Sequence, residues 1–193
     1  DGGTGTNTVT GTVGTNTTIN VIGANSGSVS LTKGVEQVVN INGIDYTMST
    51  ESTTATVIYS INDSGQITFS MSSNQAIIRG DLNKKHNVSI KAGITFYGGN
   101  KGDIIDAHGA TIYLGSGNNT LKAFGTTIYG SSGNDTVSIT DGSFFYGGTG
   151  ITNLTARSLN YIESVSGTMN LSLQGDNNTV YGTGGNNTLV SNT

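Results

Sequence analysis

Two carboxylates and an imidazole lie close together in the segment GDIIDAHG at residues 102–109. Asp103, Asp106 and His108 are residue types that bind metal ions or transfer protons. The repeat described below, however, puts Asp103 in one edge loop and His108 at the opposite corner, a strand's length away. The chain has no cysteine, only two histidines and no serine in a glycine-flanked elbow. The sequence therefore predicts that the protein is not an enzyme.

The composition excludes two classes of partner. Charged residues make up 10% of the 193-residue chain, and the formal net charge is −4. Such a surface has no basic face for nucleic acid, and no apolar run approaches the roughly 20 residues that cross a bilayer. We therefore expect no nucleic-acid partner and no membrane span. We interpret Lys84-Lys85-His86 as a solvated charge run.

Large apolar residues recur at intervals of seven to nine residues from Phe96 onward. Neither a helix nor simple strand alternation gives this spacing, whereas two short strands in each turn of a flattened coil do. Each of these residues has a same-face partner two positions away, as strands require. We predict an all-β fold, a parallel β-solenoid or β-roll with coils of 16–18 residues. The expected core positions are Ile105, Ile112, Leu121, Ile128, Val137, Phe145, Leu154, Ile162, Leu171, Val180 and Leu189.

The corners of the coil and the central segment follow different rules. Glycine, with asparagine and aspartate, recurs between the apolar positions because these residues tolerate the backbone of tight turns. The segment VVNINGIDYTM places Asn42-Gly43 between alternating strands, a hairpin signal, and ATVIYSINDSGQITFSM resembles a second hairpin. We therefore divide one continuous structural unit into N-terminal coils (1–31), an antiparallel hairpin insertion or flap (32–73) and a regular C-terminal solenoid (74–193).

The glycine loops resemble a degenerate RTX-type repeat, the haemolysin-type calcium-binding nonapeptide G-G-x-G-x-D-x-U-x with U large and apolar. The loops before Ile105 and Val137 keep the aspartate as Asp103 and Asp135, and Asn119 takes its place between them. The resemblance implies a β-roll of bacterial exported surface proteins with calcium held between neighbouring loops. Asp103, Asn119 and Asp135 would then be ligands.

Asparagine offers a different account of the same corners. It has a carbonyl oxygen without charge, whereas calcium usually takes carboxylates among its oxygen ligands. Stacked Asn and Thr side chains can instead hydrogen-bond along a column and hold the corners without metal. No cofactor is required on this interpretation, and calcium is the one candidate ion.

Four tyrosines occupy one position in successive coils. Tyr97, Tyr113, Tyr129 and Tyr146 each follow an inward-facing residue, so they should stack outward at about 4.8 Å, the spacing of paired strands. Such an aromatic ladder either stiffens the stack or offers a flat strip to a neighbouring chain or a sugar.

A repeat architecture in which the sequence predicts no cluster of catalytic side chains favours a structural role. We expect an extracellular or cell-surface bacterial protein, in a fibre, a surface layer or an adhesin stalk, that self-associates through open solenoid ends. Both terminal segments, DGGTGTNTV and GGNNTLVSNT, are repeat-like; neither has a proline and Asp1 is their one charged side chain, so we expect neither edge to be blunted. The alternative is a carbohydrate-binding or accessory module of an exported enzyme, with cell-surface polysaccharide as partner.

Overall fold

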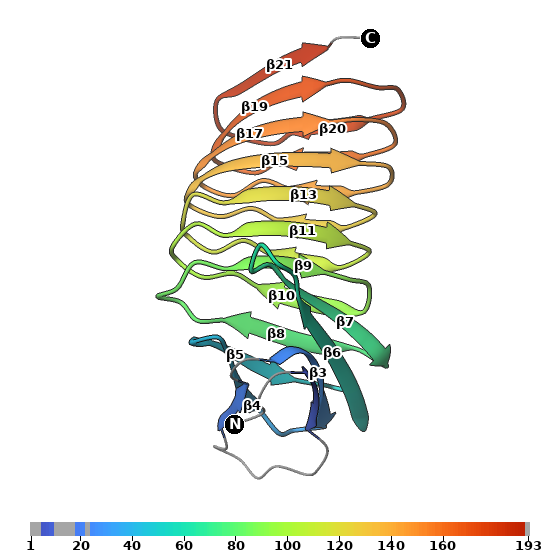
Figure 1. Ribbon diagram of the computed structural model, residues 1–193. Coiled ribbons are helices and arrows are strands. Elements are labelled where there is room, and N and C mark those ends of the chain that lie inside the picture. The colour runs from blue at the N-terminus through green and yellow to red at the C-terminus, as the bar shows by residue number, and fades with distance from the viewer. Residues whose placement is uncertain (1–4, 10–17, 22–23, 192–193) are drawn as a thin grey trace.

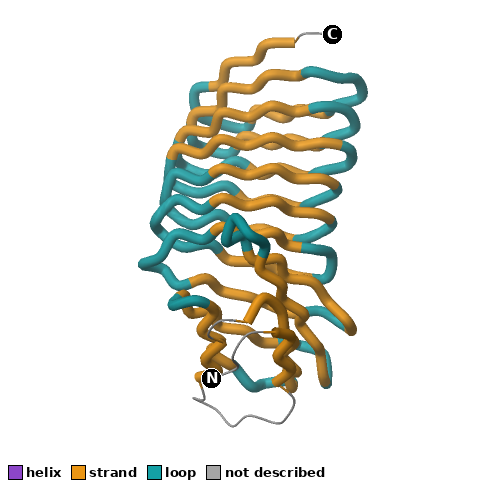
Figure 2. Tube along the Cα trace, in the orientation of Figure 1, coloured by secondary structure: helices purple, strands orange, loops and turns teal. Residues whose placement is uncertain are grey.

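The protein is a flattened coil of strands stacked in about ten turns (Figure 1). The computed structural model describes residues 5–9, 18–21 and 24–191. These residues form 21 strands in two sheets, and loops join the strands at both edges of the stack (Figure 2). The predicted all-β parallel solenoid is confirmed.

The strands alternate between the two sheets along the chain, except that β4 and β5 are both in sheet B and β6 and β7 are both in sheet A. Sheet A, in its hydrogen-bonded order, consists of β1 (Gly5–Val9), β3 (Ala24–Thr32), β6 (Thr54–Ile61), β7 (Ile67–Ser73), β9 (Asn87–Ile90), β11 (Ile104–His108), β13 (Thr120–Phe124), β15 (Asn134–Thr140), β17 (Ile151–Ala156), β19 (Thr168–Leu173) and β21 (Asn187–Ser191). Sheet B consists of β2 (Thr18–Val21), β4 (Gln37–Ile41), β5 (Ile44–Ser49), β8 (Ala76–Gly80), β10 (Ile94–Tyr97), β12 (Thr111–Tyr113), β14 (Thr127–Tyr129), β16 (Phe144–Tyr146), β18 (Tyr161–Ser164) and β20 (Thr179–Gly182).

Equivalent residues of successive coils lie directly above one another. In sheet A, Leu121 pairs with Ile105 on one side and Val137 on the other; in sheet B, Ile112 pairs with Phe96 and Ile128. Parallel pairing places like side chains in inward columns, and the two sets of columns meet in one continuous apolar core. The core positions predicted from Ile105 to Leu171 are buried.

The central segment is built into both sheets. The hairpin β4–β5 turns at Asn42-Gly43, where both residues have positive φ, and inserts two strands into sheet B between β2 and β8. The hairpin β6–β7 inserts two strands into sheet A between β3 and β9. Their inward side chains, including Tyr46 and Phe69, are part of the core. The antiparallel insertion is therefore present, but its interpretation as a flap on the solenoid is wrong, because burying these side chains requires strands inside the stack.

Each hairpin reverses the strand direction twice. In sheet A, β6 runs antiparallel to both β3 and β7, and every other neighbouring pair is parallel. In sheet B, β5 runs antiparallel to both β4 and β8 in the same way. The reversals cancel, so β1 and β21 run in the same direction, as do β2 and β20.

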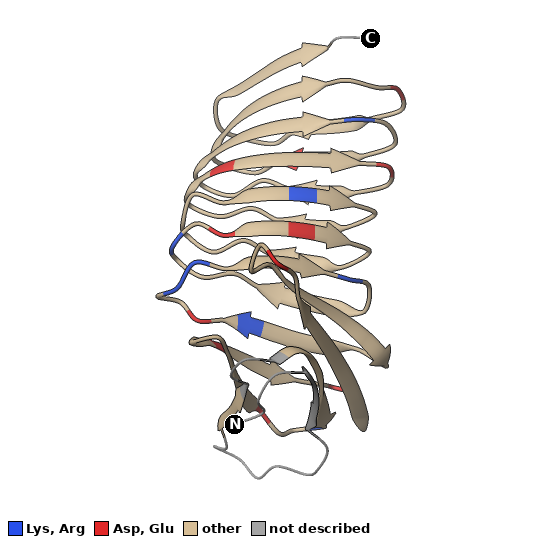
Figure 3. Ribbon diagram, viewed as in Figure 1, with Lys and Arg blue, Asp and Glu red and all other residues tan. Residues whose placement is uncertain are grey.

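Charges are sparse and scattered over this surface (Figure 3). After Ser164, the sole charged side chain in the sequence is Asp176. Within the described ranges, no helix has the length and apolar character needed to cross a membrane.

Candidate functional site

The residues proposed as calcium ligands form a buried polar column at one corner of the solenoid. Asp103, Asn119 and Asp135 lie in successive coils, and all three are buried. The backbone N–H of Asp103 donates to Asn119 Oδ1 at 2.9 Å, and the backbone N–H of Asn119 donates to Asp135 Oδ1 at 3.0 Å. Asn119 Nδ2 also donates to Asp135 Oδ1 at 2.9 Å, and Ser131 Oγ donates to Asp135 Oδ2 at 3.0 Å. The side chains thus link each coil to the next.

His86 continues this column by one coil. Its backbone N–H and its ring Nδ1 both lie within hydrogen-bond distance of Asp103 Oδ1, at 2.9 and 2.8 Å, while Gly99 N–H donates to Asp103 Oδ2 at 2.8 Å. The interpretation of Lys84-Lys85-His86 as a solvated run is wrong for His86, which is fully buried. A signal was available, because His86 precedes Asp103 by 17 residues, one coil length.

The interior beside His86 also holds a phenol. The rings of Tyr46 and His86 are 5.5 Å apart, and within the described residues neither Tyr46 Oη nor His86 Nε2 has a hydrogen-bond partner. Burial raises the pKa of Tyr46, and the negative charge of Asp103 adds to this shift. The phenol therefore stays protonated, and the group is polar but closed to solvent.

The carboxylate oxygens of this column accept hydrogen bonds from backbone N–H groups. Hydrogens of His86, Gly99 and Asn119 point at the carboxylate oxygens that a cation would use, so calcium would share these oxygens with hydrogen bonds that are already in place. In the part of the chain that the structure describes, no three His, Cys, Asp or Glu side chains form a metal-binding group. Calcium binding by Asp103, Asn119 and Asp135 stays a prediction.

The opposite corner carries a second polar column without carboxylates. Asn178 Oδ1 accepts bonds from the backbone N–H and from Nδ2 of Asn160, both at 3.0 Å. Asn160 Oδ1 accepts the backbone N–H of Ser143 at 3.1 Å, and Ser143 Oγ accepts that of Thr126 at 3.3 Å. These bonds satisfy buried backbone donors at the turns, which a solenoid without metal must do at every coil.

Asp106 and His108 lie apart from Asp103. They sit on the outward face of β11, where Asp106 Oδ1 and His108 Nε2 are 3.2 Å apart and both side chains are exposed. Asp103 is buried before β11 begins. The segment GDIIDAHG therefore does not gather its three side chains in one site.

The four predicted tyrosines form one column on the outer face of sheet B. Ring centroids of Tyr97 and Tyr113, and of Tyr113 and Tyr129, are 4.5 Å apart with interplanar angles of 3° and 7°. Tyr129 and Tyr146 are 5.1 Å apart at 13°. Each ring covers the face of the next, so the column presents ring edges and hydroxyls rather than a flat strip. Burial raises the pKa of Tyr113, and the adjacent hydroxyls of Tyr97 and Tyr129 add to it.

The tyrosine column ends differently on its two sides. Toward the C-terminus, Glu163 occupies the next place in the column, and Tyr161 continues the aromatic contacts from the neighbouring position, 6.0 Å from Tyr146. Toward the N-terminus, Arg79 occupies the next place, and its Cζ lies 5.2 Å from the ring centroid of Tyr97. The guanidinium therefore covers the last ring face by a cation–π contact.

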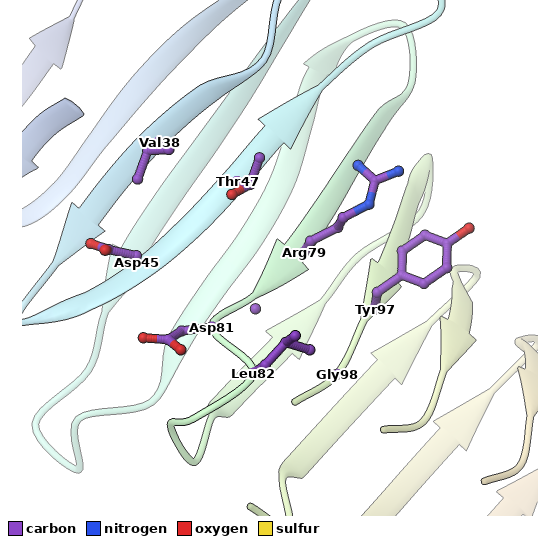
Figure 4. Close-up of a pocket in the computed structure, with 9 residues that line it drawn as sticks. Val38, Asp45, Thr47, Arg79, Asp81, Leu82, Tyr97 and Gly98 are labelled. Atoms are coloured by element: carbon purple, nitrogen blue, oxygen red, sulfur yellow. The ribbon is translucent and has the colours of Figure 1, made fainter. Parts of the chain in front are cut away.

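A hollow of about 600 Å³ opens beyond Arg79 (Figure 4). Val38, Thr47, Asp45, Arg79, Gly80, Asp81, Leu82, Tyr97 and Gly98 line it. The outward positions of β4 and β5 in this column are Val38 and Thr47, which are much shorter than tyrosine or arginine. The repeat pattern does not predict this hollow, because the hollow arises where the inserted strands interrupt the aromatic column.

The C-terminal end of the stack exposes core positions. Val180 pairs with Ile162, and Leu189 with Leu171, as the repeat requires. Their side chains are nevertheless 37% and 57% exposed, because β20 and β21 are the end strands of their sheets. The prediction that these two residues belong to the buried core is wrong for the single chain.

A scan against protein-family models finds no match for this chain. Searches of curated proteins and of solved structures find no match either. The geometry of the corners, the tyrosine column, the hollow and the open end therefore carries the functional argument.

Proposed function

We propose that this protein is an extracellular structural protein of a bacterial surface, and that its copies associate head to tail through the ends of the solenoid. The observation that carries the proposal is the exposed last coil, where Val180 and Leu189 occupy core columns that no described residue covers. An apolar core left open at an end strand favours addition of a further coil.

The end strands are chemically suited to pairing. β21 has the sequence NTLVS and β20 the sequence TVYG, with no charge or proline in either. Edge strands that avoid pairing usually carry such residues, because a row of open backbone donors and acceptors recruits other strands. Asp176, in the loop before β20, is the nearest charge in sequence.

Strand direction supports a head-to-tail rather than a mirrored contact. Because β1 runs parallel to β21 and β2 parallel to β20, a second copy shifted along the stack would continue both sheets in parallel. This contact uses two different surfaces, so it is heterologous and grows into a filament unless a rotation closes it. A fibre, a surface-layer element or an adhesin stalk all use such a unit.

The extracellular assignment rests on the resemblance of the glycine loops to RTX-type repeats. Asp103 and Asp135 keep the aspartate of that repeat, and with Asn119 they lie in successive coils. Calcium is a candidate ligand of this corner, in competition with the N–H donors that already bond to the same oxygens.

Light scattering after size exclusion, with electron microscopy of the same samples, tests this assembly. The wild-type chain should grow in mass with concentration and form filaments. The double variant Val180→Lys/Leu189→Lys should remain monomeric, with a melting temperature close to that of the wild type at a dilution where it is also monomeric, because both side chains are exposed in the single chain. Thr136→Lys, on the exposed outer face of β15, is the matched control and should assemble as wild type does.

Two outcomes would overturn the head-to-tail proposal. One is a strictly monomeric wild-type chain at high concentration. The other is a mass that stops at twice the monomer, which would indicate a two-fold contact between C-terminal ends.

A further inference from the structure

Charged, polar and apolar residues together line the hollow beside Arg79. Its floor is the short outward side chains of Val38 and Thr47 on β4 and β5. Arg79 and Tyr97 stand on one side, and Asp45 and Asp81 on the other (Figure 4). The volume of about 600 Å³ lies within the range of roughly 300–1,000 Å³ that is usual for small-molecule sites.

Two carboxylates are held in place at the rim. Asp45 Oδ1 is hydrogen-bonded by Asn40 Nδ2, and Asp81 Oδ1 accepts the backbone N–H of Asn83 at 2.9 Å. In the described part of the chain, no donor bonds to the second oxygen of either carboxylate. A backbone bond also joins β5 to the residue that follows β8, because the N–H of Asp81 donates to the carbonyl of Asp45 at 3.1 Å. The hollow thus presents carboxylate oxygens that no donor of the described residues bonds.

The part of the lining formed by Gly80 and Gly98 requires glycine because the buried corner column lies directly behind it. A Cβ on Gly80 would come within 2.6 Å of the His86 ring, and one on Gly98 within 2.6 Å of Asp103 Oδ2. The backbone can therefore approach the His86–Asp103 pair only without side chains. This close packing fixes the positions of Asp81 and Leu82, which follow Gly80 directly.

We propose that this hollow binds a neutral sugar ring, the terminal unit of a glycan. Sugar hydroxyls are donors that match the second oxygens of Asp45 and Asp81, and Arg79 can donate to a ring or hydroxyl oxygen. The apolar C–H face of the ring would lie against Val38 and Leu82; the latter is 59% exposed at the rim. The site does not depend on end-to-end assembly.

Charge and geometry disfavour the other ligand classes. The guanidinium of Arg79 also pairs with Glu36, whose Oε1 lies 3.6 Å from Arg79 Nη1. Among the charged residues that line the hollow, the two aspartates therefore outweigh Arg79, which disfavours anions there. Arg79 also covers the outer face of Tyr97, so a planar aromatic ligand has no ring to stack on. A cationic group is the remaining competitor, and the experiment includes it.

Saturation-transfer NMR on the full chain detects weak binding of sugars to monomers and filaments alike. The probes are methyl glycosides of glucose, galactose and mannose, with galacturonate and methylamine as the anionic and cationic arms. We expect saturable transfer to at least one neutral glycoside and none to galacturonate. Asp45→Asn and Asp81→Asn should each weaken binding about tenfold or more, because a charged acceptor becomes neutral.

Two further variants separate binding from folding. Thr47→Tyr would extend the aromatic column into the hollow and should abolish binding without changing the charge. Asp63→Asn, in the exposed turn between β6 and β7, should leave it unchanged. The proposal is overturned if no neutral glycoside binds saturably, if methylamine occupies the site instead, or if Asp45→Asn, Asp81→Asn and Thr47→Tyr all bind as wild type does.

Discussion

Replacing Asp103 tests whether the corner column holds the coils together through hydrogen bonds. Its carboxylate accepts the backbone N–H and ring Nδ1 of His86 and the backbone N–H of Gly99, all within 2.9 Å and all buried. In Asp103→Asn, the amide oxygen can keep the two bonds from His86, but the amide NH₂ then faces the N–H of Gly99. One buried donor is left without an acceptor, which costs about 1–3 kcal/mol.

A larger change should cost proportionally more. Asp103→Leu removes the acceptor for three buried donors, so the expected loss is about three times that of one donor. This approaches the roughly 5–15 kcal/mol that stabilises a typical domain, and the variant should be largely unfolded.

Urea unfolding followed by far-ultraviolet circular dichroism measures both effects. Asp106→Asn is the matched control, since Asp106 is an exposed aspartate in the same segment, paired with His108, and should change stability by about 0.5 kcal/mol or less. If Asp103→Asn unfolded at the same urea concentration as Asp106→Asn, the reasoning about the corner column would be refuted.

Chelator distinguishes hydrogen bonding from calcium in the same assay. On the hydrogen-bond account, the cost of Asp103→Asn is the same with and without chelator, and chelator lowers the wild-type melting temperature only modestly with strand-like dichroism retained. On the calcium account, chelator unfolds the wild type and removes the difference between the two chains.

Two further substitutions test the stacking itself. Leu121→Asp places a carboxylate in the core and should cost several kcal/mol or prevent folding, whereas Thr120→Asp on the exposed face of the same strand should be tolerated; equal melting of the two would contradict the register. Gly133→Ala should destabilise by about 1–3 kcal/mol or more, because its Cβ would overlap the carbonyl of Gly117 in the adjacent coil. Gly182→Ala, whose Cβ would meet its nearest neighbour at 3.6 Å, is the control, and a similar loss in both variants would show that loop stacking is not the cause.

The sequence predicts the columns of this fold well because every coil repeats the same constraint. Leu121 and Val137 are equivalent in the chain and adjacent in the sheet, so their spacing alone fixes their register. The Asn42-Gly43 turn was also predictable, since positive φ at both positions favours that dipeptide. What the pattern did not show is whether such a hairpin lies on the stack or within it, because that depends on which faces its strands bury.

Other features depend on neighbours that a repeat pattern does not specify. His86 follows two lysines and lacks the glycine–aspartate context of the other corners. The hint of its burial in the sequence is its spacing of 17 residues from Asp103, with which its ring pairs. Val180 and Leu189 obey the repeat, yet their exposure is set by what stacks on the last coil. The stacking of the tyrosines was predicted from their spacing. That no ring face is left open to a ligand between them follows from the centroid separation of 4.5 Å, which leaves no room between the rings.

Regular stacking is what removes binding capacity from most of this surface. Along sheet B, each ring from Tyr97 to Tyr146 is covered by the next, and along the corners each polar side chain bonds to the coil beside it. Two places where the repeat changes leave groups open to a partner. One is the hollow, where Thr47 and Val38 stand in the line of the tyrosines; the other is the last described coil, where Leu189 is exposed. A ligand bound at the first would lie on the side of a filament grown through the second, so glycan binding and assembly can occur together without competing for the same residues.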